Sequence, residues 1–370
     1  MSALRTISAE PPVAPLRMHG GEPVLLPDPS HPWESRVVLN PAAVLVTEPR
    51  ELTALARSWG LADGQTDRLI AAGGACVLLY RAQGTYDDVR GVAPSSLGLA
   101  VLTPELSVVA RRGEPVLGPD APYQNFGVED PRCTRVGDLY HLYYTGYAGA
   151  TPDAGRVRIC LATTRDFLEW DRHGPIPGDL NDVPNKNAAL LPEPVDGQWI
   201  LLHRPMEGPG AMAIHWARAD RPAGPWRTEG LLMESFRYRE FRQSWIGAGG
   251  PPLALGNGRF LMIYHQGHYT HDGRREYDLA TALLDFHQES PVRARIEPLM
   301  RPRGLQEQAD QPELGVDNVL FTCANYVFDG ELVIPYAGAD SRIFGASIPV
   351  EELLTALLRK SMKRTGRVDR

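Results

Sequence analysis

The stretch GDLYHLYYTGY at residues 137–147 begins with a turn-forming Gly-Asp pair, continues through a short apolar run and ends on aromatic and polar residues. The stretch NGRFLMIYH at residues 257–265 repeats this order of residue types. Turn residues followed by a short run of β-formers are typical of strands that are joined in hairpins. These two stretches therefore predict a fold that is built from short antiparallel strands.

The same pattern occurs five times along the chain. The other copies are GGACVLLYR at 73–81, DGQWILLHR at 196–204 and DGELVIPYAGAD at 329–340. The successive spacings are 62, 60, 62 and 71 residues between Arg81, Tyr143, His203, His265 and Tyr336, which indicates an internal repeat. Further β-rich runs lie between the copies, at 36–46, 97–102, 158–162, 212–217 and 279–284.

A repeat of about sixty residues is longer than one hairpin and fits a four-stranded sheet with its loops. Five such sheets around an axis predict an all-β protein, a five-bladed β-propeller over residues 36–348. The alternative is a β-sandwich in which the spacing arises by chance. In a propeller the inner strands converge on a central channel, so the residues that end these strands would gather there.

The two ends of the chain differ from the repeats. Residues 1–35 are rich in proline and lack a periodic apolar pattern, which predicts an irregular N-terminal arm. In residues 349–370 the pattern PVEELLTALLRKSMK places leucines at helical spacing and predicts a short C-terminal helix with a basic tail. Helical periodicity is nearly absent before this segment.

The composition excludes several classes of protein. Hydrophobic residues make up 43% and charged residues 22% of the 370 residues, as in ordinary globular chains. A net charge of -7 argues against nucleic-acid binding through a basic surface. No apolar run approaches the roughly 18 residues of a membrane helix, so we expect no membrane span.

The cysteines point to a reducing compartment. Cys76, Cys133, Cys160 and Cys323 are scattered without a Cys-x-x-Cys pair, so neither a zinc site nor a disulfide framework is expected. The N-terminal sequence lacks the apolar stretch of a secretory signal. We therefore expect reduced cysteines and a cytoplasmic location.

Charged residues recur at the ends of the repeated runs. One acid among several bases around a channel favours an acid-catalysed displacement with an anionic nucleophile or leaving group. The acid must keep its proton at neutral pH, which needs burial or a neighbouring carboxylate. Glu129 adjoins Asp130 but would point the opposite way on a regular strand. Taken singly, each of these residues is more simply a structural partner. The strand-end residues are Arg81, Asp130, His203, Arg204, His265 and Asp340.

The segment GVEDPR at 127–132, ahead of YYT at 143–145, resembles glycoside hydrolase family 130, the β-mannoside phosphorylases and related β-mannosidases. The resemblance continues in order through most of the chain. It includes NPA at 40–42, LLYRA at 78–82, NKNAALLPE at 185–193, LLHRP at 201–205, IGAGGPPL at 246–253, IYHQG at 263–267 and YAGAD at 336–340.

This resemblance implies a five-bladed propeller whose central cavity holds the active site. Asp130 would be the general acid and would act through the sugar 3-hydroxyl, while inorganic phosphate attacks the anomeric carbon with inversion to give α-mannose 1-phosphate. Phosphate is then the co-substrate, with no metal or other cofactor. The residues matching phosphate-binding positions are Arg81, Lys186, Asn187, Arg204 and His265. The candidate substrate-binding residues are Asn40, Glu129, Arg132, Tyr147, His203, Trp245 and Asp340.

The chain departs from the family pattern in two places. The family usually has Lys immediately before Ile-Gly-Ala-Gly, where this chain has Trp245, and that Lys is a phosphate ligand in the phosphorylases. Arg239 or Arg242 would be the nearest substitutes. The stretch 48–74 is also longer than the usual link, and we expect it to cover the acceptor subsite.

Two other functions remain open from the sequence. An inverting β-mannoside hydrolase on the same scaffold would need a carboxylate base to activate water, and Glu229 and Glu240 are candidates. A non-catalytic carbohydrate-binding propeller would need no protonated carboxylate. The partners we expect are an oligosaccharide and phosphate, and a homo-oligomer is left open.

Overall fold

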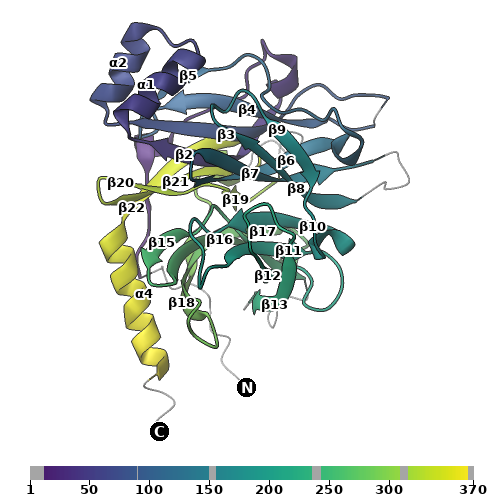
Figure 1. Ribbon diagram of the computed structural model, residues 1–370, viewed down its shortest axis with the longest axis vertical. Helices are drawn as coiled ribbons and strands as arrows, with labels where there is room; N and C mark the ends of the chain where they lie inside the picture. Colours follow the sequence, from purple (N-terminus) through teal and green to yellow (C-terminus); the bar gives the residue numbers. More distant parts are fainter. Residues whose placement is uncertain (1–11, 90, 150–155, 236–242, 309–315, 366–370) are drawn as a thin grey trace.

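The computed structural model describes residues 12–89, 91–149, 156–235, 243–308 and 316–365. The fold is all-β, as the repeat pattern predicted, and each of the five sequence copies contains a strand. Among the described residues the strands group into five antiparallel units, which we number 1 to 5 along the chain (Figure 1).

Four strands form the body of each unit. Unit 1 contains β2 (Val37–Val46), β3 (Ala75–Gln83), β4 (Ser95–Leu102) and β5 (Val108–Arg111). Unit 2 contains β6 (Gly127–Val136), β7 (Leu139–Tyr147), β8 (Val157–Thr164) and β9 (Asp171–Pro175). Unit 3 contains β10 (Asn185–Leu190), β11 (Trp199–Pro205), β12 (Ile214–Ala219) and β13 (Arg227–Met233).

Units 4 and 5 each carry one additional short strand. Unit 4 contains β14 (Ser244–Ala248), β15 (Leu253–Gly256), β16 (Arg259–Tyr269), β17 (Arg275–Asp285) and β18 (Val292–Met300). Unit 5 contains β19 (Leu320–Phe321), β20 (Tyr326–Phe328), β21 (Glu331–Gly338), β22 (Arg342–Pro349) and the N-terminal β1 (Leu16–Arg17).

The units are linked by packing more than by hydrogen bonds between strands. Units 1 and 2 share one open sheet through a single parallel pair, Ser95 with Gly127, and the other three units are separate open sheets. Five large apolar clusters lie between the units: 1 with 2, 2 with 3, 3 with 4, 4 with 5, and 5 with 1. The order of packing is therefore cyclic. The first strands β2, β6, β10 and β14 contact one another in turn, which brings their ends together.

Helices lie outside this arrangement. They are α1 (Pro49–Ser58), α2 (Asp63–Ala71), α3 (Leu305–Gln308) and α4 (Val350–Thr365), with short 3-10 turns at Met18–Gly21, Pro32–Glu34, Pro122–Gln124 and Leu180–Asp182. The C-terminal helix is confirmed as α4, and its Leu353 and Leu357 are fully buried against units 4 and 5. No helix in the described part of the chain is long and apolar enough to cross a membrane. Residues 366–370 of the predicted basic tail lie outside the described residues.

The segment between β2 and β3 corrects one expectation. It forms α1 and α2, which the search for helical periodicity missed, although Leu52 and Leu55 of α1 are buried in the cluster between units 1 and 2. The expectation that residues 48–74 cover the acceptor subsite stays a prediction. The segment joins the ends of β2 and β3 where Val46 pairs with Ala75, about 20 Å along the strand from Asn40. Figure 1 shows both helices together at a corner of the molecule beside β5.

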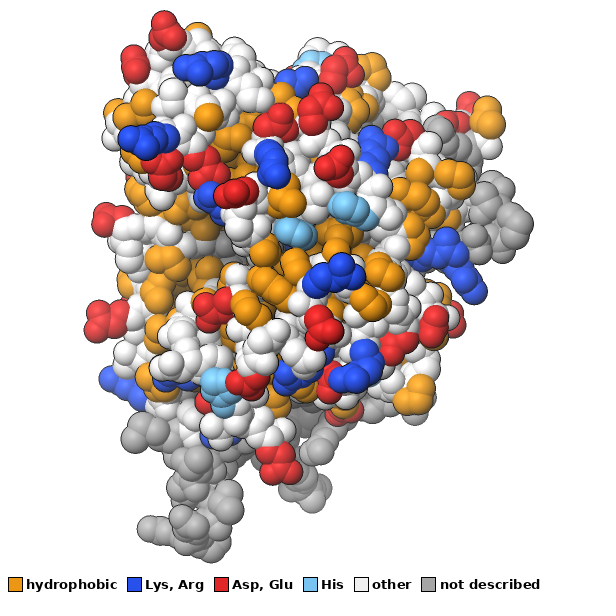
Figure 2. All heavy atoms as spheres, viewed as in Figure 1, with side chains coloured by type: hydrophobic (Ala, Val, Ile, Leu, Met, Phe, Trp, Pro, Cys, Tyr) orange, Lys and Arg blue, Asp and Glu red, His pale blue; other side chains and the backbone are white. Residues whose placement is uncertain are grey.

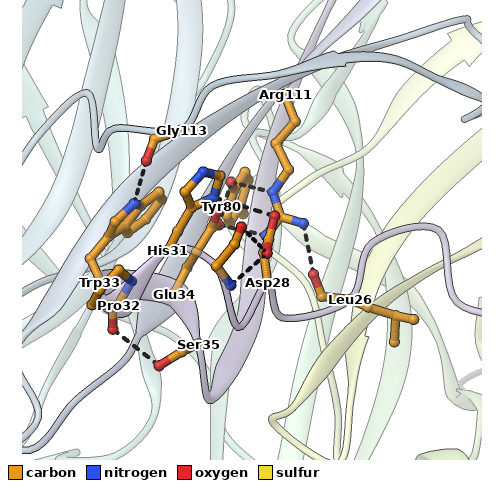
Figure 3. Close-up of polar contacts among 11 residues, drawn as sticks. Leu26, Asp28, His31, Pro32, Trp33, Glu34, Ser35, Tyr80, Arg111 and Gly113 are labelled. Atoms are coloured by element: carbon orange, nitrogen blue, oxygen red, sulfur yellow. Dashed lines mark hydrogen bonds and ion pairs between the residues drawn. The ribbon is translucent and has the colours of Figure 1, made fainter.

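The described part of the N-terminal arm is fastened to unit 1 by a polar network around Glu34 (Figure 3). Glu34 is fully buried, and its Oε2 accepts hydrogen bonds from Arg111 Nη2 at 2.5 Å and from the Tyr80 hydroxyl at 2.7 Å. Its Oε1 lies 2.9 Å from His31 Nδ1, and the Trp33 indole donates to the Gly113 carbonyl at 2.7 Å. The network fixes residues 28–35 on the strand face opposite Arg81 of β3. Residues 1–11 of the predicted arm lie outside the described residues.

Candidate active site

One backbone feature recurs at the start of the first strands of units 1, 2 and 3. In each, two residues face one residue of the neighbouring strand, which is a one-residue β-bulge. The first bulged residue has a positive φ: 47° at Asn40, 50° at Asp130 and 57° at Asn187. Asn and Asp tolerate this conformation better than other residues with a side chain. Three polar side chains that the sequence singled out therefore occupy equivalent places in three units.

The bulge brings Glu129 and Asp130 to the same partner. Arg81 Nη1 lies 3.3 Å from Asp130 Oδ1, and Arg81 Nη2 lies 2.7 Å from Glu129 Oε1. We expected the two carboxylates to point in opposite directions, and this is wrong, because the bulge interrupts the alternation of side chains along β6. Asn40 Nδ2 also donates to Asp130 Oδ1 at 2.6 Å. One guanidinium and one amide therefore fix Asp130, which is only 5% exposed.

Ser95 of β4 completes the support for Asp130 and Glu129, and the sequence analysis did not single it out. Arg81 Nε donates to Ser95 Oγ at 2.9 Å, and that hydroxyl donates to Glu129 Oε1 at 3.2 Å. Ser95 is fully buried. A serine in a strand has no distinctive pattern, so its role becomes visible only when β3, β4 and β6 are placed side by side.

Two acids of the site, Asp130 and Asp340, have pKa values that are shifted in opposite directions. Burial favours the protonated form of Asp130, but Arg81, Lys186 and Arg132 together with the Asn40 hydrogen bond hold its pKa below the usual value. The sequence argument expected burial to keep this acid protonated, and in the unliganded protein the surrounding cations outweigh burial. Burial raises the pKa of Asp340 to about 6, and the charge of Asp130 adds to this effect.

Arg132 binds main-chain carbonyls, including that of Asp130. Its guanidinium donates to the carbonyls of Gly249 at 2.7 Å, Ala248 at 2.8 Å and Asp130 at 2.9 Å, and it is 1% exposed. It therefore joins the first strands of units 2 and 4. Its predicted contact with a substrate stays a prediction.

Three basic side chains gather next to Asp130 and Glu129, namely those of Lys186, Arg204 and His265. Arg204 is 4% exposed, and its hydrogen-bond contact among the described residues joins Nη1 to His265 Nε2 at 3.4 Å. Asn187 Nδ2 lies 3.3 Å from the same His265 nitrogen. Lys186, directly before the bulge in β10, makes no hydrogen bond or ion pair within the described residues. Neither cation therefore has an acid in contact with it there.

The pKa values of these groups reflect unmatched positive charge. Burial and the nearby Arg204 lower the pKa of Lys186 to about 8, although Asp130 and Glu129 oppose the shift. Burial lowers the pKa of Arg204 to about 10. Burial and the charge of Arg204 hold the pKa of His265 well below its usual value, so its imidazole is neutral and Nε2 accepts hydrogen bonds. Such a cluster is suited to binding an anion, which would supply the missing negative charge.

Lys186 and Arg204 line a cavity of about 480 Å³. No Asp or Glu is present among the described residues of its wall. The other wall residues are Met206, Ala211, Met212, Gln243, Ser244, Trp245, Tyr269, Arg275 and Tyr277. Asp130 is not part of this wall, but the charges of Lys186 and Asp130 act on each other, so the acid adjoins the cavity at Lys186.

Comparison with known proteins agrees with this site. Residues 73–359 match a family model, Glyco_hydro_130, which is described as β-1,4-mannooligosaccharide phosphorylase. A β-1,2-mannobiose phosphorylase of Thermoanaerobacter sp. (strain X514) is 30% identical over 90% of this chain and 96% of its own length. The chain belongs to glycoside hydrolase family 130.

Two further similarities support the family 130 assignment. A 1,2-β-oligomannan phosphorylase of the same organism is 28% identical over 91% of this chain and 98% of its own length. A solved structure, whose title describes family 130 hydrolases that target β-1,2 mannosidic linkages in Candida mannan, matches with a TM-score of 0.67. That structure is 21% identical and covers 94% of this chain and 96% of its own, so it supports the fold.

Two of the candidate residues make their recorded side-chain contacts with residues outside the charged cluster described above. His203 faces away from Arg204 along β11 and contacts Asn185 and the His215 ring, and burial lowers its pKa to about 3. Tyr147 packs edge-on against Phe126 at the end of β7. Their predicted contacts with a substrate stay predictions.

Tyr277 and Arg275 are site residues that the sequence analysis missed. Both lie on β17, which belongs to none of the five sequence copies, and both line the cavity. Arg204 and Tyr277 influence each other electrostatically, and Asp340 is within range of both Tyr277 and Arg275. The sequence does place Arg275 and Tyr277 two residues apart in a β-rich run, so that both side chains lie on one face of a strand.

Proposed function

We propose that this family 130 member is an inverting β-mannoside phosphorylase, which cleaves β-mannosides with inorganic phosphate and releases α-mannose 1-phosphate. One observation carries the proposal. Lys186 and Arg204 line a cavity next to Asp130 and have no carboxylate partner among the described residues, so an anion completes the site. The relatives that cover most of the chain are named as phosphorylases of β-1,2-linked mannosides.

In the proposed reaction a phosphate oxygen attacks the anomeric carbon while the bond from that carbon to the leaving oxygen breaks. The proton leaves Asp130, passes through the sugar 3-hydroxyl and arrives on the leaving oxygen. Lys186 and Arg204 hold the phosphate, with Asn187 and neutral His265 beside it. An external nucleophile on the face opposite the acid gives inversion. Asp340 is the candidate for binding hydroxyls of the mannose that is transferred.

The charge state of Asp130 fits this order of events. In the unliganded protein the nearby cations keep its carboxyl ionised. Phosphate would neutralise part of the charge of Lys186, one of the groups that lowers the pKa of Asp130. We propose that phosphate binding thereby raises this pKa and helps Asp130 to carry the proton it must deliver.

We further propose that the five units are the blades of a five-bladed propeller. The cyclic order of the five apolar clusters and the contacts of β2, β6, β10 and β14 support this arrangement. The proposed domain limits are an arm over 1–35, the propeller over 36–348, and the C-terminal helix with its tail over 349–370.

Hydrolysis is the second candidate, because Trp245 replaces the phosphate-binding Lys of the family pattern. A hydrolase needs a carboxylate to activate water. Glu229, one candidate base, lies on the outer strand β13 and pairs with Arg227 at 3.0 Å, and it is not part of the cavity wall. Glu240, the other base, and the substitute cations Arg239 and Arg242 lie outside the described residues. Among the described residues the cavity wall holds cations and no carboxylate, which favours phosphate over water.

The test is to incubate β-1,2-, β-1,3- and β-1,4-mannobiose with the protein, with and without phosphate. Mannose 1-phosphate that forms only when phosphate is present supports the proposal. Free mannose in equal amounts under both conditions would instead establish a hydrolase. Binding of the sugars without turnover would identify a carbohydrate-binding module.

We also propose that the enzyme needs no metal or organic cofactor and acts on small molecules rather than nucleic acid or membranes. The proposed location is the cytoplasm, and the four buried free cysteines are compatible with a reducing compartment. If the chain forms a homo-oligomer, the N-terminal arm and α4 are the candidate contacts.

A further inference from the structure

Arg275 provides a third cation at the wall of the cavity that Lys186 and Arg204 also line. It lies near the beginning of β17, where it pairs with Tyr269 of β16. Its guanidinium carbon is 5.8 Å from the centroid of the Tyr269 ring, and this contact orients the side chain. Because Arg275 and Tyr277 are two residues apart on one strand, both side chains lie on the same face.

Among the described residues, no acid pairs with Arg275. It makes no hydrogen bond or ion pair with any described residue, in contrast to its neighbour Arg274, whose Nε lies 2.9 Å from Asp272. Its positive charge is felt within the site, where it lowers the pKa values of Asp340 and Tyr277 against the effect of burial. Arg275 is therefore a cation at the cavity wall whose donors have no partner among the described residues.

The aromatic residues around Arg275 explain how a Trp can stand at position 245. Trp245, Gly267 and Tyr277 form one row across β14, β16 and β17. A Cβ on Gly267 would lie 2.3 Å from Trp245 Nε1, so the absence of a side chain lets the indole lie over this glycine. The indole packs edge-on against Tyr269 and Tyr277, each with ring centroids 5.3 Å apart. Trp245 thus builds the wall that supports Arg275 and contributes no charge of its own.

We propose that Arg275 is a phosphate ligand that replaces, from β17 on the same face of the same sheet, the cation that position 245 lacks. This inference rests on the proposed phosphorylase function. A phosphate carries up to two negative charges and several acceptor oxygens, and a planar guanidinium can bind two of these oxygens at once. With Lys186 and Arg204, Arg275 surrounds the phosphate with three cations and selects it over water as the nucleophile.

A positioning role through Asp340 is the competing explanation. If Arg275 acted only on Asp340, its loss would disturb the binding of the transferred mannose as much as that of phosphate. If Arg275 binds phosphate, its loss weakens phosphate binding and leaves the sugar largely unaffected. The ratio of the two effects separates the explanations.

The experiment compares R275A, R275K and the control R274A with the unaltered protein. Kinetics are measured with phosphate varied at saturating mannoside, and with mannoside varied at saturating phosphate. We expect R275A to raise the phosphate KM by about tenfold to a hundredfold, as for loss of a charge-assisted hydrogen bond, with the mannoside KM within about twofold. R275K should recover part of the phosphate affinity, and R274A should behave like the unaltered protein.

A second readout needs no turnover. Phosphate binding measured by calorimetry without sugar should weaken in R275A by the same factor as the KM. If R275A does not fold, R275Q and R275K keep most of the side-chain volume, and R275Q should then show the loss and R275K the recovery. Equal changes in both KM values, or an unchanged phosphate KM, would overturn the inference. Absence of any phosphate requirement in the unaltered protein would instead overturn the proposed function.

Discussion

Two of the charged clusters in the interior of this protein, one at the N-terminal arm and one at the cavity, are built differently. The cluster that fastens the N-terminal arm contains Glu34, and its carboxylate is matched by Arg111, Tyr80 and His31. In the cavity cluster, Lys186 and Arg204 have no acid in contact with them among the described residues. The charge of Glu34 in the first cluster is balanced within the chain, whereas the proposed phosphate would balance the second.

The arginines of the two clusters show the difference most directly. Burial opposes the charge of Arg111, but Tyr80 and Glu34 hold its pKa above the usual value. Burial lowers the pKa of Arg204 to about 10. Arg111 therefore stabilises the fold, whereas the charged form of Arg204 is disfavoured by its burial. A buried charge without a partner is the stronger indicator of function.

If only the spacing of side chains were considered, the cluster at the N-terminal arm would be taken for a ligand-binding site. Ligand atoms of Asp28, His31 and Glu34 lie within 4.8 Å of one another, which is a spacing suited to a metal ion. Arg111 already neutralises Glu34, however, and His31 Nδ1 lies between the two carboxylates. On the face shown in Figure 2, acidic and basic side chains are likewise intermixed, and the accumulation of cations seen at the cavity is not repeated there.

Removal of the acid should have the largest effect. D130N keeps the shape and the bulge of β6 but cannot deliver a proton, so kcat should fall by about 10²- to 10⁴-fold. The release of mannose 1-phosphate measures the loss, and thermal unfolding should show a folded protein. Substantial remaining turnover would mean that another group is the acid.

The matched substitutions R111M and R204M test the comparison itself. R111M leaves Glu34 buried with its charge unmatched by Arg111, so the free energy of unfolding should fall by about 3 kcal/mol. The kcat/KM of the folded variant should stay within about twofold of the unaltered protein. Chemical denaturation measures the first quantity and initial rates the second. A stable R111M would show that the arm does not depend on this ion pair.

R204M should have the opposite profile. It replaces a buried, unpartnered cation by an apolar side chain of similar length, so stability should be unchanged or higher. The phosphate KM should rise by about tenfold or more, and the mannoside KM should change much less. Denaturation curves and two-substrate kinetics on the same preparation give both values. A strong loss of stability would place Arg204 with the structural cluster.

The smallest effect concerns pH and Lys186, whose pKa is lowered to about 8. Above this pH Lys186 loses its charge in the free site, so the phosphate KM should rise by up to about tenfold per pH unit. The unfolded chain keeps this proton up to about pH 10.5, so the contribution of Lys186 to stability should increase with pH across this window. In K186R the phosphate KM should lose this dependence. An identical pH profile in both proteins would exclude Lys186 as its source.

Local patterns in the sequence were sufficient to locate the strands but not to predict the β-bulges that interrupt them. The turn and β-former pattern located β3, β7, β11, β16 and β21, because it specifies a hairpin without help from distant residues. The convergence of Arg204 and His265 also followed from the repeat, and Lys186 was added by the family resemblance. The sequence argument failed for Glu129, because a bulge that depends on pairing with β7 reverses the expected direction of its side chain.

The remaining failures have a similar cause. The amphipathic pattern of α1 is only ten residues long and is interrupted by polar residues, so it was outweighed by the β-rich composition around it. Arg275 and Ser95 belong to strands without any motif, and they reach the site only through pairing with neighbouring strands. Such residues can be recognised only from the three-dimensional arrangement.

The repeated bulge has a consequence for redesign. Asn40, Asp130 and Asn187 share one backbone geometry, and this geometry suits Asn and Asp alike. Exchanging these two residue types would thus move a negative charge from one unit to another while the path of each strand stays the same. The proton donor could therefore be relocated from position 130 to position 40 or to position 187, where an Asp would replace the present Asn.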